Sequence, residues 1–398
     1  MEQHIKNLDA SYGAQNYHPL PVVLNKGQGV WLWDVNGKKY LDMMSAYSAV
    51  SHGHCHPELI AVMHAQSQKL SMCSRAFYSD TMPIFLEKLC TLLEYDRALL
   101  MNTGAEAVET AIKAARRWGY AHKGIADNKA EIIVFGNNFH GRTVGIVSFS
   151  SEQDYRHHFG PYLPGFHIAP FGDLEAVEKL INKNTCAVLV EPIQGEAGIV
   201  LPPSGWLKKL EQLCRAENVL LICDEIQSGI GRTGAWLACS HEDVKPDGVI
   251  LGKALGGGLY PVSALVGRAA LMDVFNPGSH GSTFGGNPLA CAIAFKALEI
   301  MDRDNYLQNS AALGEYFLSG IKTIGSSAVR EVRGKGLWIG VDLDPNMKNG
   351  RRTCEILMER GILSKETHET VVRFAPPLII TKAEIDYALV IIEDVLKA

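Results

Sequence analysis

The sequence predicts an α/β fold, with a large domain built on a mostly parallel central sheet and a smaller α+β domain. Between about residues 98 and 270, short apolar runs alternate with segments of helical periodicity, which is typical of βαβ units. The chain has 398 residues, which is too many for one ordinary hydrophobic core. Beyond Asn287 the pattern changes to long amphipathic helices and a few alternating strands, which indicates the second domain.

The large domain is predicted to begin with a strand at 98–102 that leads into a helix at 103–120. In this helix Val108, Ala111 and Ile112 have the i, i+3, i+4 spacing of a packed face. The remaining elements predicted here are one crossover helix and four buried strands rich in β-branched residues: the helix at 206–218 and the strands at 132–136, 187–192, 219–225 and 248–253.

The predicted domain boundaries fall where the pattern changes. Residues 1–48 are predicted to form an N-terminal arm and a β-meander that join the small domain. Residues 49–286 are predicted to form the large domain, and 287–398 the C-terminal part of the small domain. That C-terminal part contains predicted strands within 329–343 and 371–378 and ends in a helix.

The composition argues against several classes of function. Lys and Arg total 38 and Asp and Glu total 43, so the net charge of −5 provides no basic surface for nucleic acid. The nine cysteines form no CxxC pair and their number is odd, which favours free thiols in a reducing compartment. The start of the chain resembles neither a signal peptide nor a transit peptide, and no apolar run approaches the roughly 18 residues that a membrane span needs. We therefore expect a cytoplasmic protein without nucleic-acid or membrane partners.

Three polar residues lie where predicted strands of the sheet end: Glu191, Asp224 and Lys253. Because the carboxyl ends of the strands border the ligand crevice of an open parallel sheet, we expect these side chains to converge. Each of them alone would more often be a helix cap or a surface charge. Their combination is what indicates a site.

Lys253 has the surroundings of a lysine that forms a Schiff base. Apolar residues flank it on both sides, and such surroundings lower the pKa of a lysine and free its amine to form an imine. Residues 256–258 are all glycine, so a planar group can approach the backbone, although such runs are also common in flexible turns. Asp224 can keep the ring nitrogen of pyridoxal phosphate protonated, which this cofactor needs in order to act as an electron sink.

A candidate phosphate site lies at the start of the helix predicted at 103–120. Gly104 and Ala105 open this helix directly after a strand, so their free backbone N–H groups and the helix dipole can bind a phosphate. Ordinary connections between a strand and a helix have the same pattern. The interpretation therefore depends on the neighbouring residues.

Six motifs together resemble the class III, fold-type I aminotransferases, which use pyridoxal 5'-phosphate. The most specific are CDEIQSGIGRTG at 223–234 and DGVILGKALGGGLYPVSA at 247–264, which contain the Asp and the Schiff-base Lys at matching separation. The other four occur in the same order as in the family: NTGAEAVETAIKAAR, NFHGRT, EPIQGEAGI and HGSTFGGNP. The resemblance implies that Lys253 and Asp224 are catalytic residues.

The same resemblance implies further cofactor contacts. Phe139 would stack on the pyridine ring, Gln227 would bond the ring hydroxyl, and the helix start at Gly104 would hold the phosphate. Ser282 and Thr283 would complete the phosphate site of the other subunit. The resemblance therefore implies a homodimer with shared active sites.

Finer features resemble the ornithine aminotransferases within this family, and this resemblance runs nearly end to end. It rests on residues 32–57 and on the stretches YHPLPV, SRAFYSD, REVRGKGLW and VVRFAPPL. It implies transfer of the δ-amino group of L-ornithine to 2-oxoglutarate. The products would be glutamate and glutamate 5-semialdehyde, which can close to pyrroline-5-carboxylate, in arginine metabolism and proline biosynthesis.

The resemblance also assigns five residues to the substrates. Arg142 would bind the distal carboxylate of glutamate or 2-oxoglutarate, and Arg373 their α-carboxylate. Ornithine has no carboxylate near its reacting amine, so Glu196 would pair with Arg373 and swing away when glutamate binds. Tyr17 and Tyr47 would contact ornithine, with Tyr17 and Arg142 holding its α-carboxylate. A tyrosine in an N-terminal arm is otherwise usually a packing or dimer contact.

Three other classes of function fit the sequence less well. An acetylornithine or 4-aminobutyrate aminotransferase is the nearest rival, but the hydroxyl of Tyr47 and the YHPLPV arm suit the zwitterionic tail of ornithine better. A nucleotide-binding dehydrogenase is disfavoured because no GxGxxG follows a strand and precedes a helix. A non-catalytic scaffold would be favoured if Lys253 or Asp224 were missing.

A cluster of histidines and one cysteine could suggest a metal site. It comprises His52, His54, Cys55 and His56. Their spacing suits a loop that ends at a proline and begins a helix, whereas metal ligands need firmer geometry. We therefore expect no metal.

Overall fold

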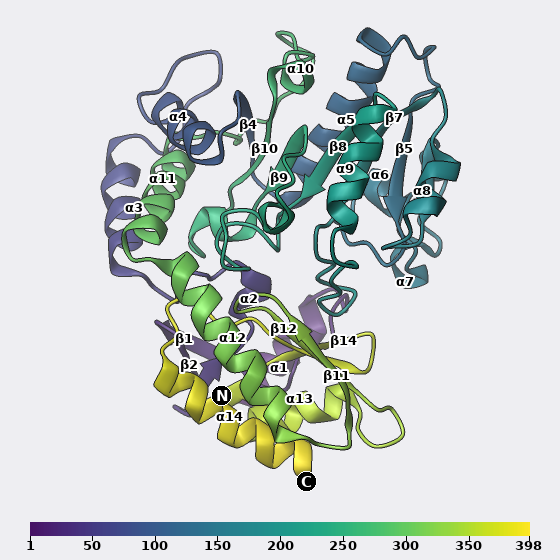
Figure 1. Cartoon of the computed structure of the whole chain (residues 1–398). Helices are drawn as coiled ribbons and strands as arrows, with labels where there is room; N and C mark the ends of the chain where they lie inside the picture. Colours follow the sequence, from purple (N-terminus) through teal and green to yellow (C-terminus); the bar gives the residue numbers. More distant parts are fainter.

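A seven-stranded sheet forms the centre of the molecule (Figure 1), and the computed structural model describes all 398 residues. Its strands are β4 (Arg97–Met101), β5 (Glu131–Phe135), β6 (Phe166–Ala169), β7 (Thr185–Val190), β8 (Leu220–Asp224), β9 (Gly248–Leu251) and β10 (Ser263–Gly267). They lie in the order β4-β10-β9-β8-β7-β5-β6. The strands from β9 to β6 run parallel, and β10 runs antiparallel to both of its neighbours.

The large unit also has a set of helices, several of which pack against the two faces of the sheet. They are α3 (Pro57–Lys69), α4 (Met82–Leu93), α5 (Gly104–Ala121), α6 (Val144–Val147), α7 (Gln153–Arg156), α8 (Leu174–Leu180), α9 (Trp206–Ala216) and α10 (Ala269–Met272), with short 3₁₀ helices η1 (Ala238–Glu242) and η2 (Lys253–Gly256). Alternate strand residues such as Ile132 and Ile222 pack with α5 in one apolar core. Their neighbours Ile133 and Leu221 pack with α4 and α9 in a second, larger core. Burial on both faces explains why these strands are continuously apolar.

A capping box fixes the start of α5. The hydroxyl of Thr103 accepts a hydrogen bond from the backbone N–H of Glu106, and the carboxylate of Glu106 accepts one from the N–H of Thr103 at 2.8 Å. The N–H groups of Gly104 and Ala105 lie in the first turn, where a helix provides no acceptor for them. The box therefore holds these two donors in place at the carboxyl end of β4.

The C-terminal part of the chain forms a second layered unit below the central sheet in Figure 1. Its antiparallel sheet has the order β11-β12-β15-β14, from β11 (Val329–Gly334), β12 (Ile339–Leu343), β14 (Lys365–Thr367) and β15 (Val371–Phe374). Its helices are α12 (Tyr306–Ile324), α13 (Gly350–Glu359) and α14 (Lys382–Lys397). Before them, α11 (Pro288–Arg303) packs against α3 and α4 and leads from the large unit into α12.

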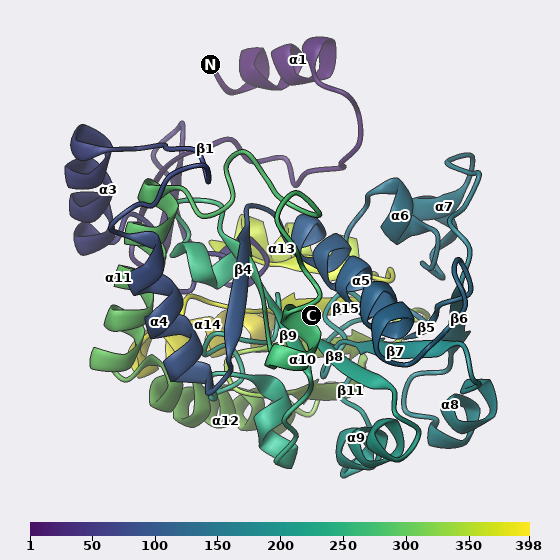
Figure 2. The same ribbon diagram turned by 90° about the horizontal axis from the view of Figure 1, so that it is seen from above.

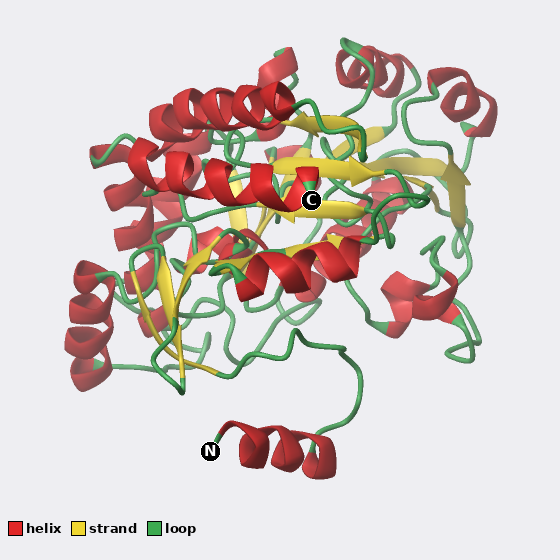
Figure 3. Ribbon diagram, turned by 90° about the horizontal axis from the view of Figure 1, so that it is seen from below, coloured by secondary structure: helices red, strands yellow, loops and turns green.

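The N-terminal residues join this second unit through a small sheet. Strands β1 (Leu24–Gln28), β2 (Trp31–Asp34) and β3 (Lys39–Asp42) form a meander, and β13 (Ile362–Leu363) pairs parallel with β3. Helix α1 (Glu2–Tyr12) lies at the edge of the molecule in Figures 2 and 3 and has no buried residue, and the Asn36 side chain donates a hydrogen bond to its Glu2 Oε2 at 2.7 Å. An extended segment, residues 13–23, connects it to β1.

After β3 the chain makes a left-handed turn, α2 (Ser45–Ser48), which contains Tyr47. All four residues have positive φ, between 43° and 71°, a conformation that costs roughly 1–2 kcal/mol per residue for L-amino acids. The carboxylate of Asp42 accepts hydrogen bonds from the N–H groups of Met44 and Ser45, and the Ser45 hydroxyl donates to Ala375 O at 2.6 Å. These contacts hold a turn that the backbone alone disfavours.

A fully buried guanidinium, that of Arg232, ties this turn to both units. It donates to the carbonyl oxygens of Leu337 and Pro376 at 2.9 and 2.6 Å and to the hydroxyls of Ser45 and Ser51 at 3.2 and 3.1 Å. Burial lowers the pKa of Arg232 to about 9. Arg232 thus joins the loop after β8 to three segments that are distant in sequence.

The histidines of the SHGHCH stretch have separate partners. His52 is buried and hydrogen bonds to Ala297 O at 2.9 Å, whereas His54 hydrogen bonds to Asp42 Oδ2 at 2.7 Å. His56 contacts the ring of His52 edge-on. No group of three His, Cys, Asp or Glu residues in this structure is arranged to hold a metal ion.

The predicted fold class, α/β with a mostly parallel central sheet, is confirmed. The predicted helices are α5 and α9, and the four predicted buried strands are β5, β7, β8 and β9. The sequence did not reveal the reversed direction of β10 or the helix α1.

All nine cysteines are free. None of the helices has the length and apolar composition that crossing a membrane requires. The domain boundaries at 48/49 and 286/287 stay a proposal.

Replacing Arg232 tests the buried guanidinium. Arg232→Met should lower the free energy of unfolding by about 2–4 kcal/mol, because it leaves buried carbonyl and hydroxyl acceptors without donors. Urea unfolding followed by circular dichroism measures the loss. Arg215→Met is the control, since that side chain is 68% exposed, and its midpoint should stay at the wild-type value. Equal midpoints for the two variants would contradict the role of Arg232.

His52 should make stability depend on pH. Burial lowers the pKa of His52 to about 4, whereas an unfolded histidine titrates near about 6.5. The unfolded state therefore binds the proton first, and stability is lost as pH falls from about 6.5 towards about 4. When the pH falls from about 7 to about 5, the free energy of unfolding of His52→Gln should drop by about 1–2 kcal/mol less than that of the wild type. The exposed His64→Gln is the control, and a matching response from both variants would refute the assignment.

Candidate active site

The carboxyl ends of β7, β8 and β9 meet at one edge of the central sheet and border a cleft of about 190 Å³. Glu191 follows β7, Asp224 is the last residue of β8, and Lys253 follows β9 after one glycine. All three side chains line the cleft. The structure therefore brings together the polar residues found at the predicted strand ends.

Asp224 lies at the buried base of the cleft and pairs with His140. Its Oδ2 lies 2.6 Å from His140 Nδ1, and its Oδ1 accepts a hydrogen bond from the N–H of Ile226 at 3.1 Å. Burial opposes protonation of His140, but the hydrogen bond and charge of Asp224 outweigh it, so the pKa of His140 is raised. His140 is absent from the predicted site residues, although it lies in the NFHGRT motif that could have identified it.

Glu191 supports the cleft wall from the adjacent strand. Its carboxylate accepts hydrogen bonds from the N–H groups of Phe139 at 3.0 Å and Gly195 at 3.3 Å. Burial raises the pKa of Glu191 to about 7, and the negative charge of Asp224 adds to the effect. Glu191 therefore fixes the backbone that positions Phe139.

Lys253 begins the 3₁₀ helix η2 with a φ of 44°, which is uncommon for a residue other than glycine. Burial lowers the pKa of Lys253, while the charges of Glu196 and Asp224 partly oppose this effect. The amine is therefore more easily deprotonated than that of a free lysine. A nucleophilic amine thus faces the same cleft as a buried carboxylate.

Four further residues predicted from the sequence also line the cleft: Gly104, Ala105, Phe139 and Gln227. A Cβ added to Gly104 would lie 2.9 Å from the terminal Cδ1 of Ile226, so a larger residue here would require the Ile226 side chain to shift. The Gln227 side chain is 8% exposed and donates to Glu196 Oε1 at 3.3 Å. This bond links the cleft to a second cavity.

The second cavity has a volume of about 740 Å³, and all five residues predicted to contact substrates line it. They are Tyr17, Tyr47, Arg142, Glu196 and Arg373. Tyr17 comes from the N-terminal segment, Tyr47 from the turn α2 and Arg373 from β15. Residues that are far apart in the chain therefore meet around one space.

Within this cavity Glu196 and Arg373 form an ion pair. Glu196 Oε1 lies 2.8 Å from Arg373 Nη1, and the two side chains are only 18% and 7% exposed. Burial opposes ionisation of Glu196, but the charges of Arg373 and Lys253 outweigh it, so the pKa of Glu196 is lowered. The ring of Tyr47 covers the guanidinium, with its centroid 5.4 Å from the guanidinium carbon. Arg373 is therefore neutralised in this structure.

Arg142 is surrounded differently, because aromatic rings rather than a carboxylate lie against its guanidinium. The ring centroid of Tyr155 lies 4.4 Å from the guanidinium carbon, and those of Tyr17 and Phe139 lie at 5.8 Å. Tyr155, from α7, is a further site residue that the sequence did not indicate. Cation–π contacts orient Arg142 and leave its N–H groups available for a carboxylate.

Ser282 and Thr283 do not line the cleft of their own chain. They lie in the loop before α11, where the Ser282 hydroxyl accepts a hydrogen bond from the side chain of Asn102 at 2.9 Å. Thr283 is exposed. Of the residues predicted for cofactor binding, these two alone stand apart from the others.

Known proteins resemble this chain over nearly its whole length. Residues 12–396 match the family Aminotransferase class-III. An ornithine aminotransferase from an Exiguobacterium species is 54% identical over 389 residues, which cover 98% of this chain and 96% of that protein.

Solved structures resemble the fold as closely. An ornithine aminotransferase from Toxoplasma gondii, with partial occupancy of PLP at its active site, has a TM-score of 0.98 at 43% identity and covers 100% of this chain and 94% of that one. The acetylornithine aminotransferase from Elizabethkingia anophelis has a TM-score of 0.90 at 45% identity, with 99% and 98% covered. The chain belongs to the class-III aminotransferase family.

Proposed function

We propose that this aminotransferase uses pyridoxal 5'-phosphate to move the δ-amino group of L-ornithine to 2-oxoglutarate. The products are glutamate and glutamate 5-semialdehyde, which can close to pyrroline-5-carboxylate. The observation that carries the proposal is the Glu196–Arg373 ion pair in a cavity that also contains Arg142. This arrangement suits an enzyme that must accept both a dicarboxylate and a diamine.

The cleft fits the cofactor at each of its functional groups. The buried Asp224 can face a protonated ring nitrogen, and the first-turn N–H groups of Gly104 and Ala105 can bind a phosphate. Phe139 can stack on the ring, and Gln227 can bond its hydroxyl. When bound, the cofactor supplies an electron sink for the carbon that carries the reacting amine.

Lys253 holds the cofactor and moves the proton. Because burial lowers its pKa, Nζ would take a proton from the δ-carbon of ornithine and deliver it to C4′ of the bound cofactor in the same half-reaction. Asp224, which pairs with His140, would face the ring nitrogen of the bound cofactor and favour its protonated form. The two catalytic residues therefore lie on adjacent strands of the sheet.

The two substrates use the second cavity in different ways. The α-carboxylate of glutamate or 2-oxoglutarate binds Arg373 after Glu196 moves away, and the distal carboxylate binds Arg142. With ornithine, Glu196 stays on Arg373, which would otherwise be an unpaired cation in a mostly buried site. Tyr17 and Arg142 then hold the α-carboxylate of ornithine, and Tyr47 contacts its chain.

An acetylornithine aminotransferase is the alternative, and the 45% identity to such an enzyme from Elizabethkingia anophelis favours considering it. Tyr47 and the N-terminal segment argue for ornithine, because hydroxyls suit its zwitterionic tail better than an acylated one. Comparison of kcat/KM for ornithine, N-acetylornithine and 4-aminobutyrate distinguishes the candidates. Equal efficiency on ornithine and N-acetylornithine would refute the preference.

A homodimer with shared active sites belongs to the same proposal. Ser282 and Thr283 lie outside the cleft of their own chain, and their implied role is in the cleft of a partner. Near them in the sequence Phe284 is 54% exposed, and Phe77 and Tyr78 of another loop are 72% and 98% exposed. Exposed aromatic side chains of this kind are typical of an interface.

We place the enzyme in the cytoplasm, in arginine and proline metabolism.

Lys253→Ala should lower kcat by at least about a thousandfold, because no other group can transfer the proton. The visible absorption that the cofactor gains when a lysine binds it should also disappear. Steady-state assays with ornithine and absorption spectra of the purified enzyme measure both effects. Lys245→Ala, at a half-exposed lysine outside both cavities, is the matched control. Sustained multiple turnover by Lys253→Ala would contradict the assignment of Lys253 as the catalytic lysine.

Glu196→Ala should change the preference between the two amino donors. It leaves Arg373 unpaired, so we expect kcat/KM for ornithine to fall by about tenfold or more, while that for glutamate is retained. Separate half-reaction rates with each donor measure the ratio. Glu331→Ala, whose carboxylate is 59% exposed, should keep the wild-type ratio. A fall of equal size for both donors in Glu196→Ala would contradict the masking role.

A further inference from the structure

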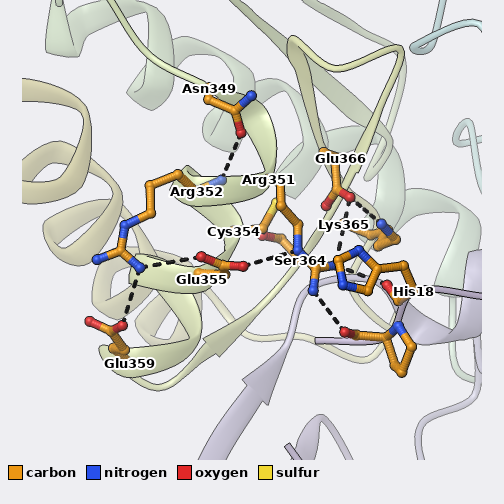
Figure 4. Close-up of polar contacts among 11 residues, drawn as sticks. His18, Asn349, Arg351, Arg352, Cys354, Glu355, Glu359, Ser364, Lys365 and Glu366 are labelled. Atoms are coloured by element: carbon orange, nitrogen blue, oxygen red, sulfur yellow. Dashed lines mark hydrogen bonds and ion pairs between the residues drawn. The ribbon is translucent and has the colours of Figure 1, made fainter. Parts of the chain in front are cut away.

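The segment between α1 and β1, residues 13–23, carries Tyr17 but has few contacts with the rest of the chain. Arg351, on α13, hydrogen bonds to the segment directly after this tyrosine (Figure 4). Arg351 Nη1 donates to the carbonyl oxygen of His18 at 3.0 Å, and Nη2 donates to that of Pro19 at 2.7 Å. Two parallel hydrogen bonds from one guanidinium fix both the position and the direction of this backbone.

In the segment 13–23, the only other hydrogen bond to a residue later in the sequence is that from the Val35 N–H to Val23 O, directly before β1. The other bonds of this stretch stay within it or lead back to α1, such as that from Lys6 to Pro21 O. Leu20 adds an apolar contact with the core. The direction of the segment next to Tyr17 therefore depends on Arg351.

Arg351 is itself held by two carboxylates. Its Nε donates to Glu355 Oε1 at 3.1 Å, and its Nη1 lies 3.8 Å from Glu366 Oε1. Glu366 also pairs with Lys365, and both of these residues line the second cavity. Figure 4 shows the carboxylates of Glu355 and Glu366 beside the Arg351 guanidinium. The Arg351 side chain is only 19% exposed. The charges fix the rotamer in which Arg351 reaches the segment.

The position of Tyr17 matters because its own contacts are weak. Its side chain is 67% exposed, and its contact with Arg142 is a cation–π contact at 5.8 Å. Such an exposed contact contributes only about 0.5–1 kcal/mol, which is too little to order a free segment. Without the Arg351 bonds, Tyr17 would leave the cavity for much of the time.

We propose that Arg351 is a positioning residue for ornithine: it fastens residues 18 and 19 so that Tyr17 stays beside Arg142 at the mouth of the substrate cavity. The inference rests on the proposed function, because it assumes that Tyr17 and Arg142 hold the α-carboxylate of ornithine. Arg351 itself does not line that cavity and acts only through the segment.

The test compares Arg351→Gln with Arg352→Gln in the cofactor-loaded enzyme. Arg352 is a matched control, because it lies on the same helix and shares Glu355 but bonds no residue of the segment. Arg351→Gln should raise KM for ornithine about fivefold to tenfold, change kcat less than about twofold, and leave KM for 2-oxoglutarate within about twofold. Arg352→Gln should match the wild type in all three values.

Two further measurements separate positioning from a general structural effect. In a Tyr17→Phe background, Arg351→Gln should add less than about twofold to KM for ornithine, because both changes remove the same interaction. Limited chymotrypsin digestion should cut after Tyr17 at least about fivefold faster in Arg351→Gln than in Arg352→Gln. Arg351→Lys, which can still donate to the carbonyl oxygens, should give intermediate cutting rates.

The outcomes distinguish this inference from the proposed function. If the wild type does not transaminate ornithine, the proposed function fails, whereas the digestion still reports on the contact made by Arg351. Equal KM values and equal digestion of the two Gln variants would overturn the inference while leaving the function intact. Full additivity with Tyr17→Phe, or a parallel loss of kcat with both substrates, would overturn it as well.

Discussion

The buried guanidinium of Arg232 is the contact on which the geometry of both cavities depends. It lies in the loop that follows Asp224, and it hydrogen bonds to the turn that contains Tyr47 and to the chain just after Arg373. A charge with no exposed surface is costly to bury, so each of its acceptors must stay in place. One side chain thus fixes how the central sheet, the N-terminal turn and the second sheet meet.

The carboxyl end of the central sheet also contains buried ionisable groups, and each of them has compensating partners. Two carboxylates and one amine lie at neighbouring strand ends, and none of them is compensated by solvent alone. Asp224 is matched by His140, and Glu191 by backbone N–H groups. The opposing charges around Lys253 keep its pKa from falling as far as burial alone would take it. The site is therefore arranged before any substrate enters it.

The sequence allowed the central sheet to be predicted, because strands buried on both faces are continuously apolar and the polar side chains of the candidate site lie at their ends. It did not indicate the direction of β10, since an apolar strand reads the same in either direction. The sequence did not indicate His140, because its partner Asp224 lies 84 residues away. It did not indicate Tyr155, because that ring meets Arg142 only through packing. Arg351 carries no motif at all. Its contacts with the N-terminal segment span more than 330 residues and exist only in the folded chain.

The left-handed turn α2 places Tyr47, which lines the second cavity, on a strained backbone. Tyr47 points into the cavity because four successive residues adopt a conformation that an unconstrained chain avoids. A glycine in place of the exposed Ala46 would relieve part of that strain. It would also let the turn relax in ways that no longer orient Tyr47. Under the role proposed for Tyr47, a substitution that relieves this strain would raise stability and at the same time weaken the discrimination between amino donors.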